Sequence, residues 1–157
     1  MYLEAVIRRR CEFLLAVAAD KSDSRDQAVT FMMRVLSNYA TIGKDAGSET
    51  IKRLNRRISR KAFDRLQNED WHIFKSTTIN EHPKPLKQMW DWIVINSEVL
   101  TAELVWQEFV KHPMITVTKE EDREMPRSDG DITTRYKGIE VLTLDADPYS
   151  YSTNQNL

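Results

Sequence analysis

Hydrophobic residues recur every three or four positions along three successive stretches of the first 68 residues. This spacing is typical of amphipathic helices, and it predicts helices over residues 2–19, 25–43 and 49–67. Ser24, followed three residues later by Gln27, has the pattern of a capping box at the start of the second helix. Because short connections join the three helices, we expect an antiparallel bundle or an orthogonal helical array.

The pattern changes after Asn68, where strand-like segments and prolines appear. Residues 77–85 are predicted to be irregular, because Pro83 and Pro85 restrict the backbone there. The other predicted elements are a short strand or helix end at 71–74, helices at 86–96 and 102–111, and strands at 113–118 and 139–144. We expect the two β-branched strands to pair with each other.

These elements together predict a mainly helical α+β fold. A three-helix part is followed by two helices and a small antiparallel hairpin or sheet. We expect one domain over residues 1–145, with a helical part at 1–68 and a mixed part at 69–145. Residues 146–157 lack periodic apolar positions and are predicted to be a flexible tail.

Composition narrows the class of protein. The chain has 157 residues, a formal net charge of −1 and one cysteine, Cys11, which excludes an internal disulfide and a cysteine-based zinc site. No apolar run reaches the roughly 18–20 residues that span a bilayer. Arginines 8–10 interrupt the first apolar stretch, unlike a secretory signal. We therefore expect a cytoplasmic protein with no membrane partner.

Positive charge is concentrated in the third predicted helix. Seven basic residues lie between Ser48 and Leu66, and only Glu49 and Asp64 oppose them. On a helix, five of them cluster on the side away from the apolar face. These are Arg53, Arg56, Arg57, Arg60 and Lys61. Cations on one stripe repel one another unless a polyanion or carboxylates offset the repulsion, and arginine suits phosphate contacts. The pattern therefore predicts DNA or RNA as a partner.

An acidic stretch of the same chain offers a second explanation for these cations. Residues 98–131 hold nine acidic and four basic residues. The basic helix can therefore face the acidic half of its own chain, that of a second copy, or an acidic protein partner. The sequence leaves these alternatives open.

Residues 80–85 carry the most suggestive chemistry, with Glu81-His82 set between Asn80 and two prolines. An acid next to a histidine in a stiff loop can hold an imidazole beside a metal ion or a water molecule. Glu81-His82-Pro83, with Asn96 fourteen residues later, resembles the start of HNH-type nucleases over about 30 residues. That resemblance implies His82 as general base and Glu81 as metal ligand. The family has a β-hairpin where residues 86–96 here are predicted to be helical.

The sequence therefore favours a nucleic-acid-associated accessory or regulatory protein of a phage or mobile element. The alternatives are a non-enzymatic interaction or self-assembling module and a metal-dependent HNH-like nuclease. A role without catalysis is favoured over an enzymatic one, and no cofactor is expected.

Overall fold

The computed structural model describes residues 3–20, 25–126 and 131–152, which belong to two compact units. The helical unit comprises residues 1–45 and 84–113, and the mixed unit comprises residues 46–83 and 114–157. Each unit thus combines two separate stretches of the chain. The change of character expected near residue 68 lies inside the mixed unit.

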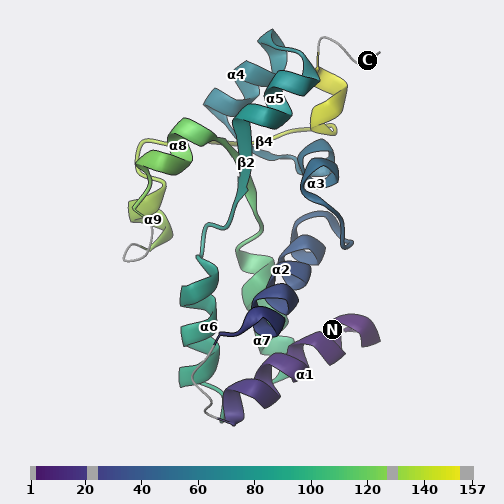
Figure 1. The fold of residues 1–157 in the computed structure, drawn as a ribbon, viewed down its shortest axis with the longest axis vertical. Coiled ribbons are helices and arrows are strands. Elements are labelled where there is room, and N and C mark those ends of the chain that lie inside the picture. Colours follow the sequence, from purple (N-terminus) through teal and green to yellow (C-terminus); the bar gives the residue numbers. More distant parts are fainter. Residues whose placement is uncertain (1–2, 21–24, 127–130, 153–157) are drawn as a thin grey trace. The chain divides into compact units, whose positions relative to one another are not determined.

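The described residues of the helical unit form four helices, which are labelled in Figure 1. They are α1 (Ala5–Ala19), α2 (Gln27–Ile42), α6 (Leu86–Ile95) and α7 (Ala102–Lys111). All four were predicted from the apolar spacing. The Asp26 side chain accepts a hydrogen bond from the Val29 N–H and caps α2, whereas the expected cap, Ser24, lies outside the described residues. Thr101 caps α7, because its hydroxyl accepts from the Leu104 N–H.

Apolar side chains from all four helices form the core of this unit. Leu14, Leu36, Ile93 and Phe109 are at most 2% exposed and belong to one cluster. Burying each such side chain contributes about 1.5–3 kcal/mol to the free energy of unfolding. Cys11 lies in the same cluster, and burial raises the pKa of its thiol to about 12.

The mixed unit is built around a four-stranded sheet with the order β2-β3-β1-β4. Its elements are α3 (Ser48–Leu54), β1 (Arg57–Ser59), α4 (Arg60–Asn68), α5 (Trp71–Thr77), β2 (Thr78–Glu81), β3 (Ile115–Thr118), α8 (Lys119–Glu124), α9 (Ile132–Arg135), β4 (Val141–Thr143) and the 3-10 helix η1 (Pro148–Tyr151). Strands β1 and β3 are parallel, while β2 pairs antiparallel with β3 and β4 antiparallel with β1. The fold is therefore mainly helical α+β, as predicted, with a mixed sheet in place of a purely antiparallel one.

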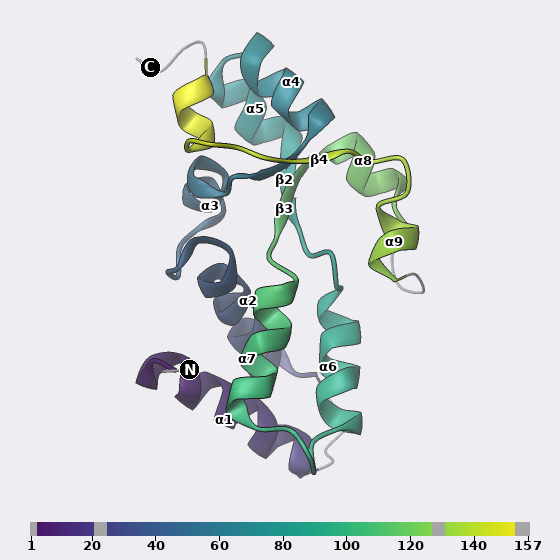
Figure 2. The same ribbon diagram turned by 180° about the vertical axis from the view of Figure 1, so that it is seen from behind.

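Two apolar clusters cover this sheet. Ile58 of β1 packs with residues of α4 and α5, and Val117 of β3 packs with Met125 and the segment after α9. Figures 1 and 2 show α8 and α9 on the opposite side of the sheet from α3. The predicted pairing of 113–118 with 139–144 is wrong, because β4 pairs with β1.

The predicted helix over 49–67 is also wrong, because it is interrupted at Asn55. The buried Asn55 amide donates to the Met114 carbonyl at 2.9 Å and accepts from the Arg57 N–H at 3.1 Å. These bonds turn the chain into β1, which places Ile58 opposite Thr116 of β3. Ser59 then caps a new helix, α4, by accepting from the Ala62 N–H.

Three shorter segments were also assigned from the sequence: residues 71–74, 77–85 and 146–157. Residues 71–74 begin a helix, α5, and residues 78–81 form β2 rather than an irregular segment. The strand ends before Pro83, so the proline removes no ladder hydrogen bond. Residues 148–151, within the segment predicted to be a tail, form η1 with Pro148 buried. The last five residues lie outside the described part of the chain.

Candidate nucleic-acid interface

The five predicted phosphate-binding cations do not share one helical stripe. Arg53 lies in the last turn of α3, Arg57 lies on β1, and Arg60 and Lys61 begin α4. Three of the five are paired within the mixed unit: Arg53 with Glu49 at 3.3 Å, Arg56 with Asp147 at 3.2 Å and Arg60 with Glu140 at 3.4 Å. Much of the expected repulsion is therefore offset inside the chain.

The carboxylates that offset these cations come mostly from unexpected segments. Glu49 lies beside them in α3, and Glu140 and Asp147 flank β4. Of the acidic stretch 98–131, Glu120 pairs with a basic residue of α4, Arg65, at 3.2 Å. Hydrogen bonds from the Trp71 indole N–H and from Arg53 lower the pKa of Glu49, and the Trp71 bond has the larger effect. The Glu49 carboxylate is therefore charged at neutral pH.

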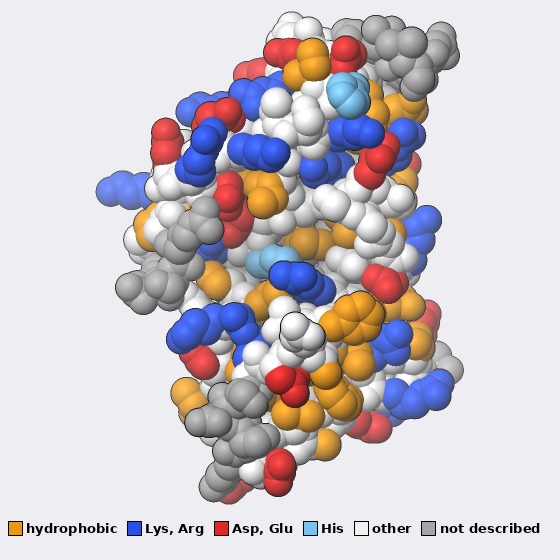
Figure 3. Space-filling view, in the orientation of Figure 1, with side chains coloured by type: hydrophobic (Ala, Val, Ile, Leu, Met, Phe, Trp, Pro, Cys, Tyr) orange, Lys and Arg blue, Asp and Glu red, His pale blue; other side chains and the backbone are white. Residues whose placement is uncertain are grey.

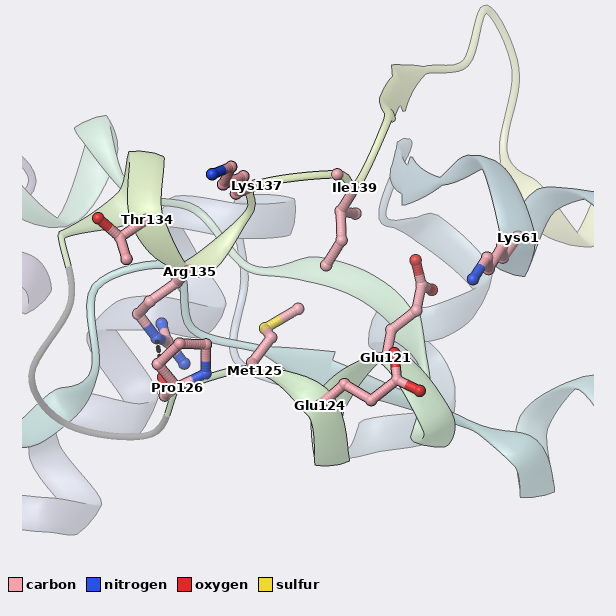
Figure 4. A pocket seen from close by; sticks show the side chains of 10 residues that line it. Lys61, Glu121, Glu124, Met125, Pro126, Thr134, Arg135, Lys137 and Ile139 are labelled. Carbon is pink, nitrogen blue, oxygen red and sulfur yellow. Dashed lines mark hydrogen bonds between the residues drawn. The ribbon is translucent and has the colours of Figure 1, made fainter.

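Arg57 and Lys61 are exposed, and neither forms an ion pair with a residue in the described part of the chain. Lys61 borders two hollows. The first, of about 200 Å³, is also lined by Glu121, Arg135 and Lys137. In the view of Figure 4, Lys61 and Lys137 lie toward opposite ends of it. The second, of about 470 Å³, is lined by Arg65, Glu120 and neighbouring polar residues.

The surface around these hollows carries both positive and negative charges, because carboxylates line them together with the cations. The buried Glu121 is committed to structure, because it accepts from the Thr118 N–H at 3.0 Å and from the Ser59 hydroxyl at 2.6 Å. Glu120 is shared between Arg65 and Arg123. Figure 3 shows cationic and acidic side chains interspersed over one face of the molecule. Phosphate attraction must therefore come from particular cations, not from a uniform field.

The Glu81 carboxylate at the end of β2 is buried and bonded through both of its oxygens. The Arg135 guanidinium donates to one oxygen, and the Tyr136 hydroxyl donates to the other. Burial raises the pKa of Glu81, although both bonds act to lower it, and burial likewise raises the pKa of Tyr136. Tyr136 is therefore a neutral donor at physiological pH.

Arg135 binds the chain around the Glu-His-Pro segment. In addition to Glu81, it donates to the carbonyl oxygens of His82, Pro83 and Pro126 at 2.8, 2.6 and 3.0 Å. The sequence analysis missed Arg135 and Tyr136. An Arg-Tyr pair after a polar loop carries no spacing signal, and the partner of Arg135 lies 54 residues away.

Asn96, the third residue of the HNH-type pattern, belongs to the helical unit, whereas Glu81 and His82 belong to the mixed unit. The Asn96 side chain donates to the Trp92 carbonyl oxygen at 2.8 Å. Within residues 3–20, 25–126 and 131–152, no group of three or more His, Cys, Asp or Glu residues is arranged to hold a metal ion.

Comparison of the chain with protein-family models, curated proteins and solved structures finds no significant match. Among the described helices, none is both long and apolar enough to cross a membrane. The functional argument therefore depends on the site itself.

Proposed function

We propose that this chain is a nucleic-acid-associated protein that binds backbone phosphates of DNA or RNA through the mixed unit. The observation that carries the proposal is the position of Lys61, an exposed cation without an ion-pair partner among the described residues, at the border of two hollows. Arg65 and Lys137 line these hollows, and they add positive charge on either side of Lys61.

Arg57 extends this surface along the sheet. It lies two residues before Ser59 on β1, so both side chains are on the same side of the sheet. Ser59 binds Glu121, which lines the hollow that Lys61 also borders. Phosphate contacts of this kind give affinity without sequence reading. With so few unpaired cations, we expect a dissociation constant of about 10⁻⁴–10⁻⁶ M at physiological salt.

Charge reversal at Arg57 and Lys61 tests this proposal. We expect Arg57→Glu/Lys61→Glu to abolish the salt-dependent binding of labelled DNA and RNA 20-mers, measured by fluorescence anisotropy. The matched control is Arg34→Glu/Lys44→Glu, which changes the charge equally at two exposed cations of the helical unit. Equal losses in both variants, or a wild-type protein that does not bind at low salt, would contradict the proposal.

A second candidate function is metal-dependent cleavage of nucleic acid. The observation that favours it is a strand–strand–helix arrangement: β2 ends at Glu81, pairs antiparallel with β3, and β3 continues directly into α8. Residues 86–95, where the HNH-type pattern has its hairpin, form the helix α6, so β2 and β3 pair across the helical segment 84–113 instead. Glu81 supports this role less well, because a metal ion must displace Arg135 or Tyr136 from its oxygens.

Plasmid nicking in the presence of magnesium or manganese tests this second function. A nuclease of this type loses its activity in His82→Ala, whereas Arg57→Glu/Lys61→Glu weakens substrate binding. A wild-type protein that leaves the plasmid intact removes the nuclease hypothesis and leaves the binding proposal standing. The self-assembly alternative has less support, since three of the five cations that motivated it pair within the chain.

A further inference from the structure

The chain between β4 and residue 152 lies over two of the predicted phosphate-binding arginines. The Arg56 guanidinium donates to a carboxylate oxygen of Asp147 at 3.2 Å and to the carbonyl oxygen of Asp145 at 3.1 Å. The Arg56 carbonyl accepts from the Leu144 N–H at 2.8 Å. Arg56 therefore holds two oxygens of the C-terminal segment, in the manner that arginine holds two oxygens of a phosphate.

An aromatic ring of the same segment lies over the second arginine. The guanidinium carbon of Arg53 is 4.1 Å from the ring centroid of Tyr149 and 5.2 Å from that of Trp71. Tyr149 and Trp71 meet edge to face, with their centroids 5.1 Å apart. A nucleobase can lie over an arginine guanidinium in the same way as the Tyr149 ring lies over Arg53, and it can also pack against a tryptophan ring.

We propose that Arg53, Arg56 and Trp71 form a binding site for single-stranded nucleic acid, which residues 145–151 occupy as an intramolecular mimic. Asp147 takes the place of a backbone phosphate, and the Tyr149 ring takes the place of an unstacked base. A hollow of about 320 Å³, lined by Arg53, Leu54, Asp147, Tyr149 and Ser150, adjoins the mimic. The proposal deepens the proposed function, on which it rests, by naming the single-stranded ligand and its intrachain competitor.

The ion pair that joins the mimic to Arg56 is exposed to solvent. The side chains of Arg56 and Asp147 are 51% and 47% exposed, and exposed pairs of this kind are screened by salt. A neighbouring anchor of the segment is separate from the arginines, because Tyr151 meets Phe63 edge to face at 5.4 Å. The segment can therefore lose its Asp147 and Tyr149 contacts while Tyr151 stays packed.

The test compares two double variants that change charge and aromatic packing equally. Asp147→Asn/Tyr149→Ala removes the mimic, whereas Glu140→Gln/Tyr151→Ala frees Arg60 and removes the other tyrosine without touching Arg53 or Arg56. We expect the first variant to bind a labelled dT 20-mer about tenfold more tightly than the second, because an ion pair and a cation–π contact no longer compete. Adding Arg53→Gln to the first variant should abolish the gain.

Equal affinity in the two double variants would overturn the proposal. Circular dichroism checks that both fold, and Asp147→Asn alone keeps the Tyr149 packing and should still give about a threefold gain. Failure of the mimic is distinguishable from failure of the proposed function. In the first case, wild-type binding persists and is lost in Arg57→Glu/Lys61→Glu; in the second, the wild type does not bind even at low salt.

Discussion

Replacing Arg135 by methionine should be among the most damaging single changes in the mixed unit. The Arg135 and Glu81 side chains are 5% and 8% exposed, so the substitution leaves a buried carboxylate without its cation. It also removes the donor from the carbonyl oxygens of His82, Pro83 and Pro126. Tyr136 still donates to Glu81 and compensates in part.

Breaking one partner of a buried ion pair costs about 3–5 kcal/mol, and each buried acceptor that loses its donor costs about 1–3 kcal/mol. These costs overlap, because the chain relaxes around the smaller side chain. We therefore expect Arg135→Met to lower the free energy of unfolding by about 4 kcal/mol, a large part of the roughly 5–15 kcal/mol typical of a domain.

Urea denaturation followed by circular dichroism measures this loss as a lower midpoint. The matched control is Arg60→Met, which removes an arginine from an exposed ion pair with Glu140. We expect this control to shift the midpoint far less, because exposed pairs are screened by solvent. If Arg135→Met and Arg60→Met have the same urea midpoint, Arg135 does not hold the Glu81–Pro83 segment in place.

Three further predictions concern other parts of the fold. Burial raises the pKa of Glu108, but bonds from Lys84 and His112 outweigh it and leave the pKa below its ordinary value. The stability that Glu108 contributes should therefore be present at neutral pH and lost as pH falls below the ordinary glutamate range, so that wild type and Glu108→Gln converge in acid unfolding curves. Cys11, with its pKa raised to about 12, should resist iodoacetamide at pH 8 until urea unfolds the helical unit. Thr118→Ala removes the cap of α8 and should lower the free energy of unfolding by about 1 kcal/mol in urea denaturation, whereas Thr118→Ser retains the cap.

The helical unit was largely predictable because its order is local. Residues three and four positions apart on α1, α2, α6 and α7 meet in one core, and Thr101 marks a helix start in the sequence. The mixed unit was harder because its contacts are distant in sequence. Ile51, Leu54, Ile58 and Ala62 have helical spacing, yet a bond from Asn55 to Met114, 59 residues away, breaks the helix.

The candidate site was predictable only in part, for the same reason. Charge density identified Arg53, Arg56, Arg57, Arg60 and Lys61. The ion-pair partners of Arg53, Arg56 and Arg60, however, are 4 to 91 residues away along the chain. No periodicity connects Arg56 to Asp147 or Glu81 to Arg135, because each pair is brought together by the sheet order β2-β3-β1-β4 and the segments that cover it. The residue types in the sequence suggested phosphate binding, but only the structure shows which cation pairs with which carboxylate.

The salt dependence of nucleic-acid binding tests the central claim most directly. Each phosphate contact contributes about 0.7–0.9 to the slope of log K against log salt concentration. For the wild type, log K for a labelled oligonucleotide should therefore fall linearly with log salt concentration, and the slope of Arg57→Gln/Lys61→Gln should be shallower by about 1.4–1.8. An unchanged slope in this variant would contradict the assignment of Arg57 and Lys61 as phosphate contacts.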